Sequence, residues 1–300
     1  MATPAGDGLR PVAARRSRGR LARAAALLGV ALAMVSSTVR GQAPARNREP
    51  VLLRLHPHVG DTLHTRLEQQ TETSGSQSTG AGLQRPMITT VVVSARTIVQ
   101  TSRASTTTVL TIVDSADVHS SDSRSASMSA QAERVLRGQQ LVLQLAEDGS
   151  VQSARDARGV AVSRDVAEAM AAMPPVFPHR AVSVGERWER EMPLPTGGPF
   201  GARGAAHVRA DFRLDSLGRN GELAYVSMRG EIVPEGGAQR LELSGNVSGA
   251  MRVDRTRGWM TDSRFSILIK SIVTPPPASG MSPMHFVTKV TQHLRTMDKR

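Results

Sequence analysis

The sequence has 300 residues, a formal net charge of +12, no cysteine and only 3% aromatic residues. The lack of cysteine excludes disulfide bridges and a lipid anchor attached through a thiol. So few aromatic rings, together with the lack of a dense basic run, exclude the usual means of binding nucleic acids and sugars by stacking.

The first 45 residues have the order of regions that is typical of a secretory signal peptide. A cationic segment with six arginines from Arg10 to Arg23 precedes an apolar run at residues 24–35 and small residues up to Ala45. The apolar run is too short for a spanning helix, which needs roughly 20 residues. We expect cleavage after Ala45 and a soluble product that is exported, periplasmic or extracellular, and not a lipoprotein.

The predicted leader carries seven of the 38 basic residues and one of the 26 acidic residues, so the net charge falls from +12 to +6 on its removal. A polar connector at residues 46–50 then leads into a single β domain at residues 51–295. We expect no transmembrane span after leader cleavage.

Two similar turn sequences organise this domain. Val-Gly-Asp-Thr-Leu stands at residues 59–63 and Val-Gly-Glu-Arg-Trp at residues 184–188, and each precedes a series of alternating segments. This similarity indicates a weak internal duplication of antiparallel β units. The two repeats are placed at about residues 51–162 and 179–295.

The first repeat is rich in residues that favour strands, interrupted by turn signals. A stretch of Ser, Thr and Gly at residues 73–84 is expected to be a mobile hairpin loop. The strands expected are residues 62–71, 88–100, 105–114 and 140–145, the last ended by the turn pair Asp148-Gly149.

One helix is expected between the repeats, at residues 163–173. Ser163 can cap its first turn, and Pro174 stops it. Its apolar residues recur at helical spacing at Val166, Ala169, Met170 and Met173.

The second repeat has the clearest period of two. In residues 208–215 apolar side chains alternate with charged ones, so one face is expected to meet a core and the other water. Further strands are expected at residues 223–232, 240–253, 259–272 and 285–294. The predicted fold is mainly β: a strongly curved antiparallel sheet or incomplete barrel built from two weak repeats, with one short helix between them.

No arrangement of residues points to catalysis. The sequence contains no Gly-x-Ser-x-Gly elbow, Ser-x-x-Lys, His-Glu-x-x-His or phosphate-binding loop. Asp61 and Glu186 occupy equivalent places in the two repeats and are interpreted as acceptors of amide hydrogen bonds in turns, rather than as an acid and base pair. We expect no enzyme activity, no catalytic residue and no cofactor.

Two groups of polar residues resemble metal ligands. His56 and His58 would share one strand face, but Pro57 between them and the lack of nearby acids favour solvated histidines. A second group lacks the spacing of a calcium loop and is interpreted as a polar loop. This second group consists of Asp114, Asp117 and Asp122 around His119. The first group, the histidines, also includes His64. We expect no metal.

Three short motifs resemble uncharacterised exported bacterial domains. They are Leu-x-Leu-x-Pro-x-Val-Gly-Asp at residues 53–61, Val-Gly-Glu-x-Trp at 184–188, and the Val253-Asp254 strand leading to Gly258. The pattern over most of residues 51–295 is similar to the superfamily of lipoprotein-carrier and lipoprotein-insertion proteins, in which a curved antiparallel sheet wraps around helices. The resemblance implies an apolar concavity able to hold an acyl chain, although this sequence offers one clear helix where the carriers use several.

We therefore expect a non-enzymatic envelope protein that binds an apolar or lipid-like small molecule in a concave sheet. The alternative is a structural or scaffold domain that docks another envelope protein, and an enzyme with an unrecognised site is a third reading. No nucleic acid partner is expected. The residues expected to line the ligand site are Val208, Phe212, Leu214, Val226, Met228, Phe265 and Ile267.

Overall fold

The computed structural model describes residues 49–77, 85–103, 105–159, 176–193, 206–235, 241–275 and 282–297. The chain divides into two units, Met1–Pro44 and Ala45–Arg300, and all described residues belong to the second. The predicted leader up to residue 45, and the predicted helix at residues 163–173, lie outside the described residues. None of the described helices has the length and apolar character needed to cross a membrane.

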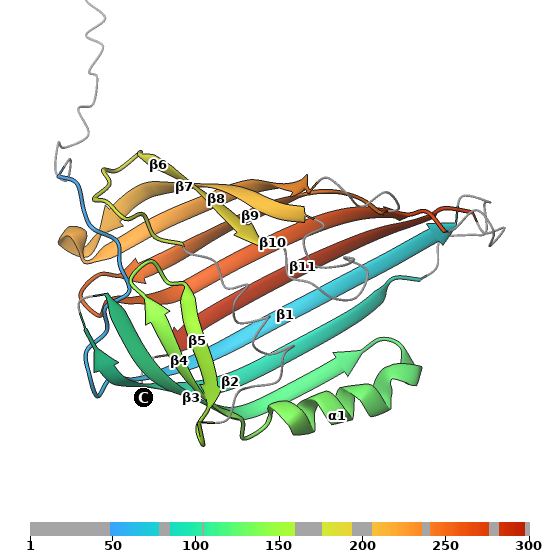
Figure 1. Cartoon of the computed structure of the whole chain (residues 1–300), viewed down its shortest axis with the longest axis horizontal. Coiled ribbons are helices and arrows are strands. Elements are labelled where there is room, and N and C mark those ends of the chain that lie inside the picture. The colour runs from blue at the N-terminus through green and yellow to red at the C-terminus, as the bar shows by residue number, and fades with distance from the viewer. Residues whose placement is uncertain are drawn as a thin grey trace, which may run out of the picture. The chain divides into compact units, whose positions relative to one another are not determined.

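The strands form one antiparallel sheet (Figure 1). Eleven strands are described: β1 (Thr62–Gln77), β2 (Met87–Ser102), β3 (Thr106–Ser120), β4 (Gln140–Ala146), β5 (Val151–Asp156), β6 (Arg187–Pro193), β7 (Ala206–Gly218), β8 (Leu223–Pro234), β9 (Leu241–Asp254), β10 (Trp259–Val273) and β11 (Met284–Met297).

The strand order is β5-β4-β3-β2-β1-β11-β10-β9-β8-β7-β6. All neighbours are consecutive in sequence except β1 and β11, which pair from His64 with Met297 as far as Gln77 with Met284. The first and last strands of the domain therefore meet in the middle of the sheet, and β5 and β6 are its two edges (Figure 1). The fold-class prediction is confirmed: the chain is mainly β, and its antiparallel sheet is curved, not closed into a barrel, and has a helix between strands.

The period of two in β7 determines which way the sheet faces. Val208, Ala210, Phe212 and Leu214 are buried, while the charged residues between them, such as Arg209, are exposed. We call the face that carries these four residues and their cross-strand partners the inner face, and the opposite face the outer face. As expected from the sequence, charged neighbours pair on the outer face: Arg209 lies 3.3 Å from Glu189 and 3.8 Å from Glu231.

The core lies on the inner face and joins the two edges of the sheet. One hydrophobic cluster includes Leu141, Leu143 and Leu145 from β4, together with Trp188 and Met192 from β6. These strands lie near opposite edges of the sheet, so their side chains reach one cluster only because the sheet curves around its inner face.

Two extended segments, residues 51–56 and residues 176–182, cross the curved sheet at one end of the core. Val51 of the first segment exchanges two backbone hydrogen bonds with Val182 of the second, at 2.8 and 2.9 Å. The first segment also bonds to the β4–β5 turn through Leu55 and Glu147, and to the β9–β10 turn at Gly258. Buried Leu53 and Leu55 show why: this segment covers apolar side chains that the open sheet would leave exposed.

The described helix lies elsewhere than the predicted one. Residues Ser123–Ser125 form a 3-10 turn that leads into α1 (Ala126–Leu136), between β3 and β4. The Glu133 carboxylate accepts a hydrogen bond from the amide of Val118 in β3, at 2.9 Å, and Gly138 follows the helix with a φ of +76°. This helix was not predicted from the sequence; none of its residues is buried, and Met128 and Val135 are exposed.

The expected polar loop around His119 is wrong for most of its residues. Asp114, Asp117 and His119 lie in β3, which pairs with β2 as far as Thr89 opposite Ser120. Asp114 forms an ion pair with Arg96 of β2 at 2.9 Å. Cross-strand pairing therefore keeps a polar sequence extended where its own composition favours a loop.

The expected hairpin loop at residues 73–84 is also too long, because β1 continues to Gln77 and only residues 78–84 lie outside the described part. Residues Thr73–Gln77 pair with Thr288–Met284 of β11. Gly75 lies under the ring of Phe286, since a Cβ placed on it would be 3.0 Å from that ring. The neighbouring aromatic side chain thus covers a glycine that by itself disfavours a strand.

Candidate functional site

The two turns singled out in the sequence have the same hydrogen bonding. The Asp61 carboxylate accepts a bond from the amide of His58 at 3.1 Å, and the Glu186 carboxylate accepts one from the amide of Ser183 at 2.8 Å. In both turns the glycine has a φ near +90°, at Gly60 and Gly185. The interpretation of Asp61 and Glu186 as turn acceptors is confirmed, and the duplication as a whole stays a prediction.

The seven residues expected to line a ligand site all lie on the inner face. Phe265 and Ile267 are half-buried, and the others are less than 5% exposed and belong to the core. Those five are Val208, Phe212 and Leu214 of β7, and Val226 and Met228 of β8. These five residues therefore lie in the packed interior, and the accessible part of the inner face lies on other strands.

Half-buried apolar side chains continue from Phe265 and Ile267 across the middle of the inner face. Leu67 of β1 stands opposite Val93 on one side and Leu294 on the other, and Ile267 stands opposite Val290. We call these residues the floor strip; it consists of Leu67, Val91, Val93, Phe265, Ile267, Val290 and Leu294, all half-buried. The strip covers four adjacent strands, β2, β1, β11 and β10.

Two glutamines interrupt the floor strip. Gln69 and Gln292 are cross-strand partners on β1 and β11, and Gln292 also stands opposite Phe265. Both are half-buried. Their amide groups give an otherwise apolar surface a pair of hydrogen-bond donors and acceptors.

An aromatic and methionine row connects β6 with the floor strip. The rings of Trp188 and Phe212 are stacked, with centroids 5.7 Å apart and an angle of 10° between their planes. Met228 and Gly249 follow on the next two strands, and a Cβ on Gly249 would lie 2.4 Å from the ring of Phe265. The Phe265 ring therefore lies over Gly249, and this close contact is possible only because glycine has no side chain.

Arg190 of β6 lies on the inner face between Trp188 and Met192 and opposite Ala210. Its Nη2 donates a hydrogen bond to the carbonyl oxygen of Phe177. Its Nε atom is buried and has no hydrogen-bond partner. Arg190 was not predicted as a site residue, although Trp188, Arg190 and Met192 alternate in the sequence with two glutamates, which is a usable signal.

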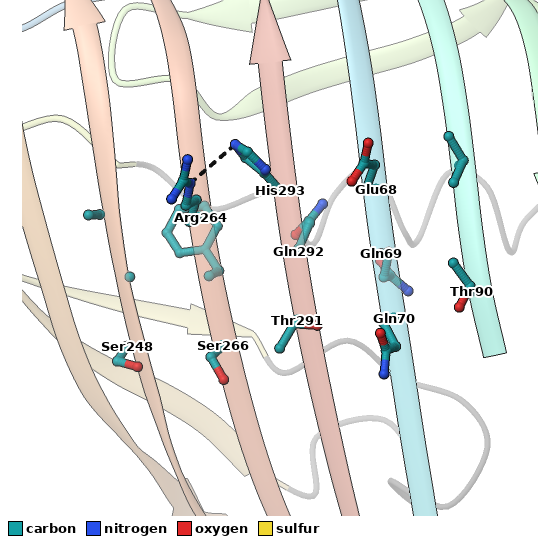
Figure 2. A pocket seen from close by; sticks show the side chains of 14 residues that line it. Glu68, Gln69, Gln70, Thr90, Ser248, Arg264, Ser266, Thr291, Gln292 and His293 are labelled. Atoms are coloured by element: carbon teal, nitrogen blue, oxygen red, sulfur yellow. Dashed lines mark hydrogen bonds between the residues drawn. The ribbon is translucent and has the colours of Figure 1, made fainter. Parts of the chain in front are cut away.

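The outer face carries a hollow of about 520 Å³ over β2, β1, β11, β10 and β9 (Figure 2). Half of its lining residues are uncharged and polar, and one end carries the group Glu68, Arg264 and His293 (Figure 2). Ten of its lining residues are outer-face positions: Glu68, Gln70, Thr90, Val92, Ser248, Ala250, Arg264, Ser266, Thr291 and His293. The other four, Gln69, Gly249, Phe265 and Gln292, are inner-face positions of the same strands.

The charged side chains at the end of this hollow are engaged with one another and with their neighbours. Arg264 donates to Nε2 of His293 at 3.2 Å, the bond drawn in Figure 2. The hydrogen bond from Arg66, 2.8 Å long, lowers the pKa of the Glu68 carboxyl below its usual value. Glu68 is therefore a charged acceptor in an ion pair and is poorly suited to take up a proton.

The histidine group does not converge on a metal site. His58 is exposed and lies 3.6 Å from Asp61, and Nδ1 of His56 lies 3.4 Å from the Ser102 hydroxyl. Nε2 of His64 is buried without a partner. Within the residues that the structure describes, no group of three or more His, Asp and Glu residues is placed to hold a metal ion.

Protein-family models and curated proteins give no match to this chain. Three solved structures have low similarity. DynF from the dynemicin biosynthesis pathway of Micromonospora chersina is 8% identical, with a TM-score of 0.23, over 86% of this chain and 92% of that one. An outer membrane channel from Pseudomonas putida F1 is 9% identical, with a TM-score of 0.18, over 85% and 98% of the two chains. A mutant of the TodX monoaromatic hydrocarbon channel is 9% identical, with a TM-score of 0.16, over 80% and 91%.

These TM-scores are too low to carry an inference from any of the three proteins to this chain. The class defined by the chain's own structure is an open, curved antiparallel β-sheet with an apolar inner face.

Proposed function

We propose that this chain is a non-enzymatic, exported envelope protein that binds an apolar or lipid-like ligand on its inner face. The floor strip carries this proposal. Its seven apolar side chains lie on four adjacent strands around the two glutamines and are only half-buried, whereas Phe212, Met228 and Val247 on β7, β8 and β9 are packed in the core.

Covering the floor strip is energetically favourable. Burial of apolar surface contributes about 25 cal/mol per Å², so a ligand that removes roughly 100 Å² from water gains about 2.5 kcal/mol before other terms. The amides of Gln69 and Gln292 offer hydrogen bonds to a polar part of the ligand. A flexible chain with a polar group fits this combination better than a compact polar metabolite.

The resemblance to lipoprotein carriers and lipoprotein-insertion proteins supports the same ligand class, because it implies an apolar concavity for an acyl chain. Export follows from the predicted leader. An intact mass that starts at Arg46 in protein recovered from outside the cytoplasm would support cleavage after Ala45, and a retained residue 1–45 segment would contradict it.

Two assays test the ligand. The first is organic extraction of protein purified from its own envelope, followed by mass spectrometry of the extract. The second is uptake of an apolar fluorescent probe by delipidated protein. We expect a bound amphiphile in the first assay and saturable probe uptake in the second.

A matched pair of variants places the ligand on the inner face. Val290 and Val287 lie on the same strand, but Val290 belongs to the floor strip and Val287 is exposed on the outer face. We expect Val290→Asn to weaken probe binding several-fold and Val287→Asn to leave it unchanged. Equal effects, or a wild-type protein with no bound lipid and no probe uptake, would reject this site and favour the scaffold alternative.

A further inference from the structure

Arg190 is an isolated charge on the inner face. Across β6 to β11, and on through β1 and β2, it is the one charged side chain that the pairing register of the described strands places on this face. Its neighbours along β6 are Trp188 and Met192, both in the hydrophobic cluster. A guanidinium group stays charged at any relevant pH, so this arrangement places a permanent cation among apolar side chains.

The hydrogen bonding of this cation is incomplete. The Phe177 carbonyl accepts one bond from Nη2, while Nε is buried and unpaired. None of the acidic residues in the described ranges forms an ion pair with Arg190. Arg190 is half-buried, and a charge that is partly removed from water without an opposite charge nearby is costly.

The side chains next to Arg190 are small. Ala210 stands opposite it on β7, and Gly230 follows on β8. A Cβ on Gly230 would lie only 2.5 Å from the carbonyl oxygen of Arg209, so the backbone passes too close for a larger residue. The row beside the guanidinium therefore carries no side chain longer than a methyl group on these two strands.

The same row continues to the floor strip and includes two buried core residues, Ala210 and Val247. From Arg190 the cross-strand partners are Ala210, Gly230, Val247, Ile267 and Val290. Strands are spaced by about 4.8 Å, so five intervals span roughly 24 Å along the sheet and less across its curve. This separation is comparable with the length of an extended long-chain acyl group.

We propose that Arg190 binds the oxyanion headgroup, a carboxylate or a phosphate, of a long-chain amphiphile whose tail covers the floor strip. The inference rests on the proposed function and gives its ligand a chemical class. Guanidinium N–H groups bind carboxylate and phosphate oxygens through charge-assisted hydrogen bonds. Arg190 as a whole is half-buried and donates one hydrogen bond from Nη2, so its guanidinium has further N–H groups to offer such a headgroup.

The test compares three ligands that share one tail. Hexadecanoate, hexadecyl phosphate and hexadecanol compete with an apolar fluorescent probe for the full mature chain. We expect the wild type to bind at least one of the two anions at least tenfold more tightly than the alcohol, a difference of about 1.4 kcal/mol. Whichever anion is preferred identifies the headgroup, and acetate or inorganic phosphate alone should not displace the probe.

Arg190→Gln removes the charge, and Arg187→Gln removes a charge on the same strand but on the exposed outer face. We expect Arg190→Gln to bind the alcohol like the wild type and to lose the preference for the anion, while Arg187→Gln keeps both. If Arg190→Gln does not fold, Arg190→Lys decides: a retained but weaker preference supports a charge-based anchor.

Three outcomes overturn the headgroup assignment while the proposed function stands: equal affinity for all three ligands, an anion preference that survives in Arg190→Gln, or loss of all preference in folded Arg190→Lys. Displacement of the probe by acetate or inorganic phosphate alone would overturn the assignment of a long-chain amphiphile as the ligand and would indicate a site for a free oxyanion. Failure of the wild type to bind the probe or any of the three ligands would instead reject the proposed function itself.

Discussion

The carboxylate of Glu186 accepts a hydrogen bond from the backbone amide of Ser183, 2.8 Å away, and so closes the turn that leads into β6. This bond, together with one from Arg180, lowers the pKa of the Glu186 carboxyl. A carboxyl group whose folded-state pKa is lowered contributes stability above its unfolded pKa, near 4.5, and loses it as the pH falls through the folded value.

We therefore expect Glu186→Gln to be less stable than the wild type at pH 7, and the difference to shrink as the pH falls from 4.5 through the lowered pKa of the Glu186 carboxyl. Urea unfolding midpoints at pH 7, 5 and 3 measure this difference. Glu242→Gln, at an exposed glutamate on β9, is the control and should show little difference at any of these pH values. A gap for Glu186→Gln that stays constant with pH would contradict the role of the charge.

Phe212 is buried at the centre of the core and stacked on Trp188. Phe212→Ala should destabilise the domain by about 3–5 kcal/mol, because it removes a large buried side chain and leaves a cavity. The nearby Arg209→Ala should cost no more than about 1 kcal/mol, since its three acidic partners are exposed. Chemical denaturation of the two variants checks the contrast, and similar losses for both would mean that the outer-face ion pairs stabilise the domain as much as this core residue does.

Gly258 has a φ of +59°, and a Cβ on it would lie 2.2 Å from the carbonyl oxygen of His56. The His56 amide donates to the Gly258 carbonyl at 2.8 Å, so this contact anchors the N-terminal crossing segment on the β9–β10 turn. We expect Gly258→Ala to destabilise the protein by more than Gly159→Ala, which has a φ of +82° but open space around it and should cost about 1–2 kcal/mol. Equal unfolding free energies for the two variants would show that the segment moves aside without loss.

The indole N–H of Trp188 donates to the carbonyl oxygen of Val176 at 2.9 Å, while the amides of Val176 and Phe177 donate to the Asp148 carbonyl in the β4–β5 turn. This dipeptide thus links the two edges of the sheet. Trp188→Phe keeps a ring on Phe212 but removes the donor, at a cost of about 1 kcal/mol.

The local readout for Trp188→Phe is hydrogen exchange at the amides of Val176 and Phe177, which should become faster than in the wild type. Tyr225→Phe, at an exposed position on β8, is the control and should leave these amides unchanged. Unchanged exchange in both variants would mean that the Asp148 carbonyl alone holds the dipeptide.

The sequence predicts strands well where one face is buried and the other is in water. In β7 the apolar residues from Val208 to Leu214 face the core, so the period of two is plain in residues 208–215. The polar ends of β1 and β3 could not be found in this way. Thr73–Gln77 is extended because β11 pairs with it, and Asp117 because it stands opposite Val92 of β2.

The helix α1 shows a different limit. It has no buried residue, and its apolar side chains Met128 and Val135 are exposed, so packing against the core does not define it. Arg134 in its last turn and Gly138 after its end were the available signals. They are weak because basic residues and glycines also occur in many loops.

For the candidate site, the alternation of apolar and polar residues placed Val208, Phe212 and Ile267 on the correct face. It could not show which of these side chains are covered by other parts of the chain. Coverage depends on the curvature of the sheet and on the two segments that cross it. Arg190 was visible in the sequence as an arginine in an apolar alternation, yet its unpaired Nε could be known only from the folded surroundings.

The sequence by itself determined the strands with one buried face, the glycine turns at Gly60 and Gly185, and the face on which each side chain of a strand lies, because these depend on residues close together in the chain. The tertiary structure alone decided that β1 pairs with β11, that β5 and β6 remain edges, and that the floor strip is half-buried. The physical reason is that pairing and burial join residues far apart in sequence, such as Leu67 and Leu294, and no local pattern encodes that choice of partner.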